Sequence, residues 1–301
     1  MKALKITIFA PSSPPDQGKL QEGLDIIKRE GPKIIWSPNP SMAADGPHGQ
    51  FSYLAGKDEA QWKDFENLIK DASLDFIWAA RGGYGSSRWA GKVHLDGTKD
   101  NYPLLIGFSD VTFLHSALLR NGLCAIHAPL ITTLSDTSEE SRCALWYCLS
   151  HGVFPVLKGR PVTTGKTPGR LAGGNLTCLV HSLSTPYEPP WDKTILLIED
   201  HNEAPYKIDR MLTHLLHSGR LSRLAGIAAG SLLTERYHCF DLEGLLKDRL
   251  SGLGIPVIMD VPAGHCPDNY PLLLGGAYEL DADTGVLRPL GGADPAKSLA
   301  R

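Results

Sequence analysis

The stretch Leu104–Leu119, LLIGFSDVTFLHSALL, joins an apolar strand to an amphipathic helix through the short turn Gly107–Asp110. Its first residues form an apolar run of strand length, and the apolar residues from Val111 to Leu118 then recur at helical spacing. A strand that leads directly into a helix is the repeating unit of parallel sheets, whose crossover connections are usually helices. The stretch therefore predicts an α/β fold, and it puts Ser109 at the point where a strand ends.

The first half of the chain repeats this alternation. Strands are predicted at Leu4–Ala10, Lys33–Trp36, Leu74–Ala80, Leu104–Ile106 and Ala125–His127, and helices at Gly18–Arg29, Glu59–Lys70, Asp110–Arg120 and Ser138–Leu149. Strands that are apolar throughout are typical of a parallel sheet covered by helices on both faces. Such sheets bind ligands at the carboxyl ends of their strands, where this chain has the loops APSS, ARGGYGS and GFSD.

A segment rich in glycine, proline and threonine, residues 151–175, divides the chain. We expect it to be a linker between an N-terminal domain, residues 1–150, and a C-terminal domain, residues 176–301. The second domain is predicted to contain helices at Leu176–Leu183, Pro205–Ser218 and Leu242–Leu250, strands at Thr194–Ile198, Leu224–Ala229 and Pro256–Met259, and short terminal strands. It is expected to be a smaller α/β unit.

The composition argues against several kinds of partner. The 301 residues are 42% hydrophobic and 21% charged, ordinary for a soluble globular protein, with a net charge of −3. No polybasic run points to nucleic acid or a membrane, and no apolar run is long enough to span a bilayer.

The apolar stretch ITIFA is too short for a secretion signal, and the six cysteines form no CxxC pair, which favours the cytoplasm. No metal-site spacing is present, and no cofactor is expected.

Ser109 has two interpretations. As a nucleophile it would lie on a sharp strand-to-helix turn, where the small residue Gly107 leaves room and the hydroxyl projects. As a helix cap it would accept a hydrogen bond from the first helical turn, and the local pattern favours this role. The two roles are compatible, because backbone N–H groups at a helix start can also bind an oxyanion.

The loop Arg81–Gly85 follows the third predicted strand. Its glycines allow the backbone to approach a ligand closely, so an N–H group here would suit either a phosphate or the oxyanion of acyl transfer. The glycine spacing and the lysine of a nucleotide-binding loop are absent, so a nucleotide site has little support. A plain tight turn explains the glycines equally well.

Carboxylates and a histidine follow strands of the second domain. Glu199 and Asp200 come at the end of the strand Thr194–Ile198, where a carboxylate either orients a histidine or is simply solvated. His265 lies in a loop of glycine and proline with no helix or strand face to pack on, which favours a functional role. Its neighbour Cys266 is not expected to act with it, because adjacent side chains diverge.

The chain order Ser109, Glu199, His265 is compatible with a serine hydrolase. In such an enzyme the histidine takes the serine proton and the carboxylate orients the imidazole. Because all three residues follow strands, they would meet in a cleft between the two domains. His127 also ends a strand and would line the same cleft, while Glu203 is the rival carboxylate four residues after Glu199.

Six segments, taken in order, resemble the LD-carboxypeptidase family, serine peptidases that include the microcin C self-immunity hydrolases. The segments are APSS (10–13), ARGGYGSSR (80–88), IGFSDVT (106–112), GRLAGGNLT (169–177), LLIEDHNEAPYKIDRMLTHL (196–215) and VPAGHCPDNYPLLLG (261–275). They occur in family order from near Ile6 to about Leu280. The resemblance therefore covers almost the whole chain.

The resemblance implies a flavodoxin-like N-terminal domain, a smaller C-terminal α/β domain and, usually, a homodimer. It implies a catalytic triad of Ser109, Glu199 and His265, with oxyanion donors at the backbone N–H groups of Asp110 and Gly83. The implied reaction is hydrolysis of the bond between an L-centre and a terminal D-amino acid. The implied substrate is murein tetrapeptide, which would lose its terminal D-alanine during cell-wall recycling.

Some features of the implied site stay open. A carboxypeptidase must bind a terminal carboxylate, so a cation is expected near the cleft, with Arg81 as the candidate. The sequence departs from the family pattern at Phe108, where tyrosine is frequent, and at Ala128, where glycine is common. Two other functions are compatible with the sequence: a microcin C-type immunity hydrolase that cleaves a peptidyl- or aminoacyl-nucleotide, and a non-catalytic small-ligand-binding module in which Ser109 is only a cap.

Overall fold

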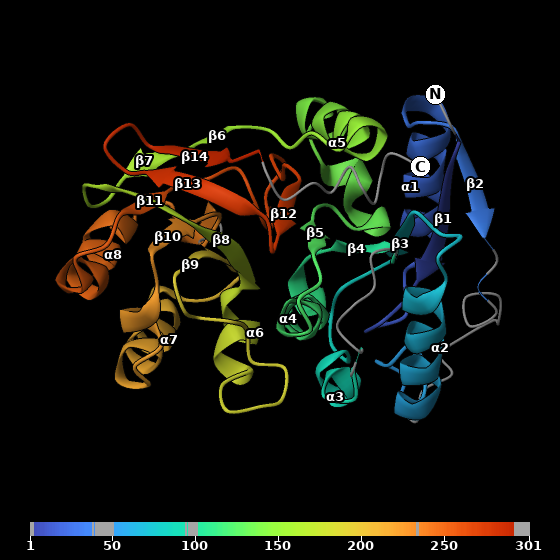
Figure 1. Ribbon diagram of the computed structural model, residues 1–301, viewed down its shortest axis with the longest axis horizontal. Coiled ribbons are helices and arrows are strands. Elements are labelled where there is room, and N and C mark those ends of the chain that lie inside the picture. The colour runs from blue at the N-terminus through green and yellow to red at the C-terminus, as the bar shows by residue number, and fades with distance from the viewer. Residues whose placement is uncertain are drawn as a thin grey trace.

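Two β-sheets lie side by side, each with helices packed on it (Figure 1). The computed structural model describes residues 3–37, 39, 51–93, 95, 102–232 and 235–291. The first sheet has the strand order β12-β5-β4-β3-β1-β2, and the second has the order β6-β14-β13-β8-β9-β10-β11-β7. Within the described ranges, no helix has the length and apolar character needed to cross a membrane.

The first sheet is parallel except at one edge. Its strands are β1 (Leu4–Phe9), β2 (Ile34–Ser37), β3 (Phe76–Ala79), β4 (Leu104–Gly107), β5 (Ala125–His127) and β12 (Leu272–Leu274). The order β2-β1-β3-β4-β5 is that of flavodoxin-like folds, which confirms the expected fold class. The edge strand β12 comes from the second half of the chain and pairs antiparallel with β5. A segment of the expected C-terminal domain thus completes the N-terminal sheet.

Helices cover both faces of the first sheet. One face packs against α1 (Gln17–Glu30) and α5 (Glu139–His151), and the other against α2 (Asp58–Lys70), α3 (Ser87–Ala90) and α4 (Thr112–Arg120). The central strands β3 and β4 are buried along their whole length. Burial on both faces explains why their sequences are apolar runs without alternation.

The second sheet carries helices on one face. Its strands are β6 (Leu157–Lys158), β7 (Arg160–Pro161), β8 (Lys166–Asn175), β9 (Thr194–Glu199), β10 (Gly226–Ala229), β11 (Val257–Met259), β13 (Ala277–Asp281) and β14 (Val286–Pro289). The helices α6 (Leu176–His181), α7 (Pro205–His217) and α8 (Leu242–Leu250) pack against β9, β10 and β11. The strands β8 to β11 are parallel, so their carboxyl ends lie at one edge.

The prediction of a linker at residues 151–175 is wrong, because this segment contains β6, β7 and β8. β8 lies inside the second sheet, between β13 and β9. A Cβ added to Gly173 would lie 2.1 Å from the carbonyl oxygen of Leu197, and one added to Gly174 would lie 2.6 Å from Oγ1 of Thr112. These glycines allow β8 to pack closely against β9 and α4.

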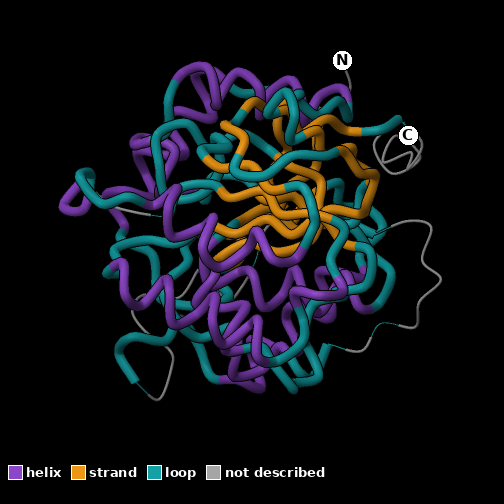
Figure 2. Tube along the Cα trace, turned by 90° about the vertical axis from the view of Figure 1, so that its left-hand side faces the viewer, coloured by secondary structure: helices purple, strands orange, loops and turns teal. Residues whose placement is uncertain are grey.

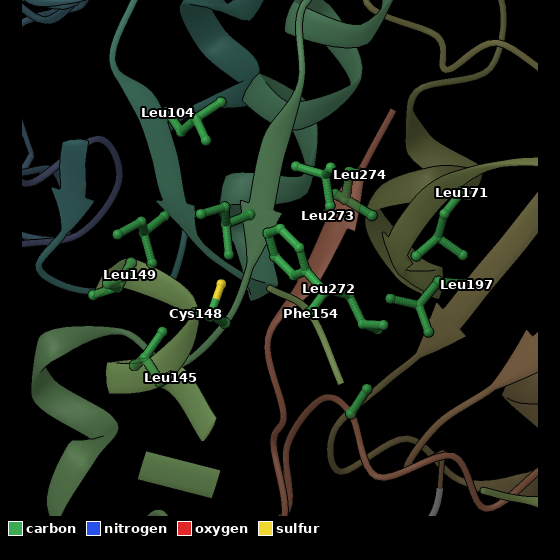
Figure 3. Packing of buried hydrophobic residues seen from close by; sticks show 14 of the residues in the cluster. Leu104, Leu145, Cys148, Leu149, Phe154, Leu171, Leu197, Leu272, Leu273 and Leu274 are labelled. Atoms are coloured by element: carbon green, nitrogen blue, oxygen red, sulfur yellow. The ribbon is translucent and has the colours of Figure 1, made fainter. Parts of the chain in front are cut away.

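The two sheets share one hydrophobic core. Figure 3 shows this core extending from Leu104 of β4 and the apolar face of α5, through β12, to Leu171 of β8 and Leu197 of β9. Seen from the side, the strands gather inside the molecule and the helices lie around them (Figure 2). The continuous core holds the strand ends of both sheets at fixed positions relative to one another.

Candidate active site

A pocket of about 590 Å³ lies where the carboxyl ends of strands from both sheets meet. The residues that line it follow β3, β4, β8, β9 and β11, and they include Gly83, Tyr84, Ser109, Asp110, Asn175, Thr177, His181, Asp200, His201, Glu203 and His265. This is the edge at which parallel sheets bind ligands. Ser109 and His265, far apart in the sequence, are thus brought to one pocket.

Ser109 has a backbone conformation that only a minority of non-glycine residues adopt. Its φ is +65°, and it begins a single 3-10 turn, Ser109–Val111, ahead of α4. Neither this turn nor α4 has a side-chain hydrogen bond at its N-cap, so the expectation that Ser109 caps the helix is wrong. A left-handed serine between a strand and a helix is the geometry of a nucleophile elbow.

The surrounding loops hold Ser109 in this conformation. A Cβ added to Gly82 would lie 2.9 Å from Cβ of Ser109, so the glycine loop packs directly on the serine. The buried carboxylate of Asp110 accepts hydrogen bonds from Oγ of Ser12 at 2.6 Å and from the backbone N–H of Ser86 at 2.9 Å. Burial raises the pKa of Asp110, although these hydrogen bonds oppose the shift. One carboxylate therefore joins the loops after β1, β3 and β4.

His265 and Glu199 form a hydrogen-bonded pair, with Nδ1 of His265 2.7 Å from Oε2 of Glu199. Glu199 is fully buried. Burial alone would lower the pKa of His265, but the charge and hydrogen bond of Glu199 outweigh it, so this pKa is raised. When the carboxylate accepts the proton of Nδ1–H, Nε2 is the nitrogen that can take a proton from a serine.

Two rings and a glycine fix the position of the imidazole. The ring of His265 packs against Phe108, with ring centroids 4.7 Å apart, and stacks on His201, with centroids 4.8 Å apart. Gly264 has a φ of +103°, and a Cβ there would lie 2.6 Å from Cβ of Glu199. Within the part of the chain that the structure describes, Oγ of Ser109 makes no hydrogen bond to His265. Such bonds often tighten only when the substrate binds.

Gly83 has the features of an oxyanion donor. Its N–H donates no hydrogen bond to any described residue, and Gly83 lines the pocket beside the loop residue that packs on Ser109. A Cβ at Gly83 would lie 2.4 Å from Oγ of Ser13, and its φ of +98° also favours glycine. An N–H group held in place beside a nucleophile is suited to stabilising developing negative charge.

Asp200 organises the pocket wall contributed by the second sheet. Its carboxylate accepts hydrogen bonds from Nδ2 of Asn175 at 3.1 Å and from the backbone N–H and the hydroxyl of Thr177 at 2.9 and 2.8 Å. The N–H of Asn175 donates to Oγ1 of Thr112 in α4, which ties the two sheets together. Asn175, Thr177 and His201 all lie in family-like segments, but nothing in the sequence alone assigns them a role.

Arg81 and His127 do not line the pocket. The guanidinium of Arg81 is exposed and donates to the carbonyl of Pro14 at 2.7 Å. His127 is fully buried against Phe108, with ring centroids 5.7 Å apart, and burial lowers its pKa to about 4. Among the described residues, those that line the pocket include histidines but no lysine or arginine, so the cation expected from the sequence is not found there.

Cys266 and Glu203 are also placed by the structure. The thiol of Cys266 donates to the carbonyl of Asp268, and burial raises its pKa to about 11, which favours the less nucleophilic thiol form at neutral pH. Glu203 lines the pocket but pairs with Lys207 at 2.8 Å, whereas Glu199 contacts His265. Among the described residues, no group of three or more histidine, cysteine or acidic side chains is arranged to hold a metal ion.

Comparisons with known proteins identify the family of this chain. Models of the LD-carboxypeptidase N-terminal and C-terminal domains match residues 6–128 and 168–280. A putative carboxypeptidase of Synechocystis sp. is 37% identical over 94% of this chain and 93% of its own length. A probable murein peptide carboxypeptidase of Bacillus subtilis is 31% identical over 90% of this chain and 86% of its own length.

Solved structures share the fold. A muramoyltetrapeptide carboxypeptidase from Oxalobacter formigenes is 26% identical, with a TM-score of 0.79 over 95% of this chain and 97% of its own. The microcin C7 self-immunity protein MccF has a TM-score of 0.82 over 96% of both chains, but at 18% identity it shows the fold alone. Both domain models match in order and together cover most of the chain, so the protein belongs to the LD-carboxypeptidase family of serine peptidases.

Proposed function

We propose that this protein is a serine carboxypeptidase that releases the terminal D-alanine from murein tetrapeptide. The observation that carries the proposal is the Glu199–His265 pair, 2.7 Å apart, whose histidine lines the same pocket as Ser109. The family membership and the names of the B. subtilis and O. formigenes relatives support the choice of a murein peptide as substrate.

In the proposed mechanism, Oγ of Ser109 attacks the carbonyl carbon of the L,D-peptide bond while Nε2 of His265 takes the hydroxyl proton. The backbone N–H groups of Gly83 and Asp110 bind the oxyanion that forms. His265 then gives its proton to the amine of the leaving D-alanine, and the acyl group stays on Ser109. A water molecule, deprotonated by His265, releases the shortened peptide. Glu199 stabilises the imidazolium in both steps.

The terminal carboxylate of the substrate needs a partner that Arg81 does not supply. The remaining basic groups of the pocket are the imidazoles of His181 and His201 together with His265. We assign the carboxylate to His181 and His201, assisted by backbone N–H groups. No cofactor is part of the proposal. The cytoplasmic location rests on the short N-terminal apolar stretch and the cysteine pattern, and the homodimer rests on the family resemblance. Sedimentation velocity of the purified protein would measure the dimer directly.

The test is a mass-spectrometric assay of the purified protein on murein tri-, tetra- and pentapeptides. We expect conversion of tetrapeptide to tripeptide only, with loss of that activity in Ser109→Ala by several orders of magnitude. A serine-directed covalent reagent should label Ser109. Such labelling would argue against a non-catalytic binding module, in which Ser109 is not an activated nucleophile. A protein that cleaves a peptidyl-nucleotide but leaves tetrapeptide intact would show the microcin-type alternative to be right.

A further inference from the structure

Three exposed aromatic rings form a row that begins at the active-site pocket: Tyr84, Tyr53 and Phe51, here called the aromatic row. Tyr84 lines the pocket, and its ring centroid lies 5.9 Å from that of Tyr53. The centroid of Tyr53 lies 5.3 Å from that of Phe51, with the two rings parallel to within 2°. The three side chains are 47%, 48% and 42% exposed. The row thus leads out of the pocket over the surface.

The aromatic row is held by the same loops that hold the nucleophile. Leu54, next to Tyr53, is buried, and its N–H donates to the carbonyl of Phe51 at 3.0 Å. The N–H of Ala55 donates to the carbonyl of Ser12, whose hydroxyl binds Asp110. The backbone that carries Phe51 and Tyr53 is therefore anchored before any ligand arrives, which lowers the entropy cost of binding on these rings.

A line of exposed aromatic rings that starts at a pocket and continues over the surface indicates a ligand that extends beyond that pocket. Hydroxyls on two of the rings add hydrogen-bonding groups to the apolar faces. Such a surface suits a ring with apolar C–H faces and hydroxyl groups at its edge, which describes a sugar.

Building on the proposed function, we propose that the aromatic row binds the muramoyl sugar carried at the N-terminus of a murein peptide substrate. Tyr84 directly follows Gly83, the proposed oxyanion donor, so the row starts beside the bond that is cut. Three peptide residues separate that bond from the sugar, and three extended residues span about 10 Å. The two centroid distances beyond Tyr84, 5.9 and 5.3 Å, limit the length of the row to a value of the same order.

The charges near the row favour a sugar over a nucleotide. A nucleotide brings phosphate groups, which are usually bound by unpaired arginine or lysine. The guanidinium of Arg88, which also interacts with the hydroxyl of Tyr84, is held by both carboxylate oxygens of Asp58 at 2.7 and 2.9 Å. Within the described ranges of the chain, no lysine or arginine lines the pocket.

The test compares free murein tetrapeptide with muramoyl tetrapeptide as substrates of the parent protein and of the variants Phe51→Ala, Tyr53→Ala and the double variant. We expect the variants to raise KM for muramoyl tetrapeptide roughly 3- to 10-fold for each ring removed, with kcat unchanged. KM for the free tetrapeptide should not change. The matched control is Tyr147→Ala, which removes an exposed ring (54%) that stacks on His151 in α5, outside the pocket lining.

The outcomes separate this inference from the function on which it rests. A parent protein that cleaves neither substrate overturns the proposed function and the sugar subsite together. A parent that cleaves both, with row variants that behave like Tyr147→Ala or that lose both activities equally, overturns only the subsite. Inhibition by adenosine monophosphate that the double variant abolishes would show instead that the row takes a nucleobase. Unchanged melting temperatures verify that the variants are folded.

Discussion

Replacing Gly264 by alanine should slow turnover about a hundredfold, although the changed side chain touches no substrate. The new Cβ would lie 2.6 Å from Cβ of Glu199 and 2.7 Å from its Oε2, where van der Waals contact needs about 1 Å more. Because Glu199 is fully buried, the strain moves either this carboxylate or the loop that carries His265. A displacement of about 1 Å in a catalytic group is enough to cost on the order of 10²-fold in rate.

The same substitution should also lower stability. An L-residue at a positive φ costs roughly 1–2 kcal/mol, and an overpacked core position typically costs a further 1–3 kcal/mol. Gly254 provides the control, because its φ of +64° carries the first cost but nothing lies within 4 Å of an added Cβ. Gly254→Ala should therefore destabilise the protein modestly and leave turnover unchanged.

The assay measures kcat/KM for D-alanine release, the rate at which a serine-directed reagent labels Ser109, and the melting temperature. The labelling rate reports on the nucleophile without depending on which peptide is the substrate. A folded Gly264→Ala variant with the parental kcat/KM would contradict the inference that this glycine sets the Glu199–His265 geometry. Equal losses of kcat/KM in Gly264→Ala and Gly254→Ala would refute it too, because only the positive φ is common to both.

Three further predictions concern the titratable groups. Glu199→Gln should lower kcat by about 10⁴-fold, whereas Glu203→Gln should change it only a few-fold; the reverse result would identify Glu203 as the partner of the histidine. Because Glu199 raises the pKa of His265 above its ordinary value near 6.5, kcat/KM should fall as the pH drops through that raised value, where His265 becomes protonated and cannot act as a base. Glu199→Gln should move this limb of the pH profile to lower pH, and a limb that does not move would contradict the assignment. Burial lowers the pKa values of His115 and His127 to about 3 and about 4, so below pH 6.5 the unfolded chain binds protons that the folded protein does not. As the pH is lowered from 7 to 5, urea denaturation should then show the free energy of unfolding falling by up to about 1.4 kcal/mol per pH unit for each histidine. If replacing one of these histidines with leucine leaves the dependence of this free energy on pH unchanged, the buried histidines are not its cause.

The fold of the first half could be predicted because its signals are local. Strands buried on both faces are apolar runs, and the strand–turn–helix unit at Leu104–Leu119 matches β4 and α4 apart from one 3-10 turn. β8 could not be predicted, because its glycines, which allow close packing on β9 and α4, give the segment the same glycine-rich composition as a flexible linker. β12 could not be predicted either, since nothing in a run of three leucines tells which of two sheets it will join.

The site was predictable where it depends on strand ends and unpredictable where it depends on how loops fold. Parallel sheets put the residues after their strands at one edge, and this rule placed Ser109 and His265 at one pocket. The same rule does not predict that the side chain of Arg81 binds the carbonyl of Pro14 and does not line the pocket. It also missed Tyr53, which meets Tyr84 only through tertiary packing.

The antiparallel edge strand β12 has a consequence for the order of events during synthesis. Until residue 274 leaves the ribosome, β5 has an open edge of unpaired backbone groups, which is a site for wrong strand pairing. At roughly 5–20 residues per second, this exposure lasts on the order of ten seconds after β5 itself has been made. His265 precedes β12 by only a few residues, so the same late segment delivers the proposed catalytic base and closes the sheet. A nascent chain that ends before residue 265 therefore has an open β5 edge and lacks the proposed catalytic base.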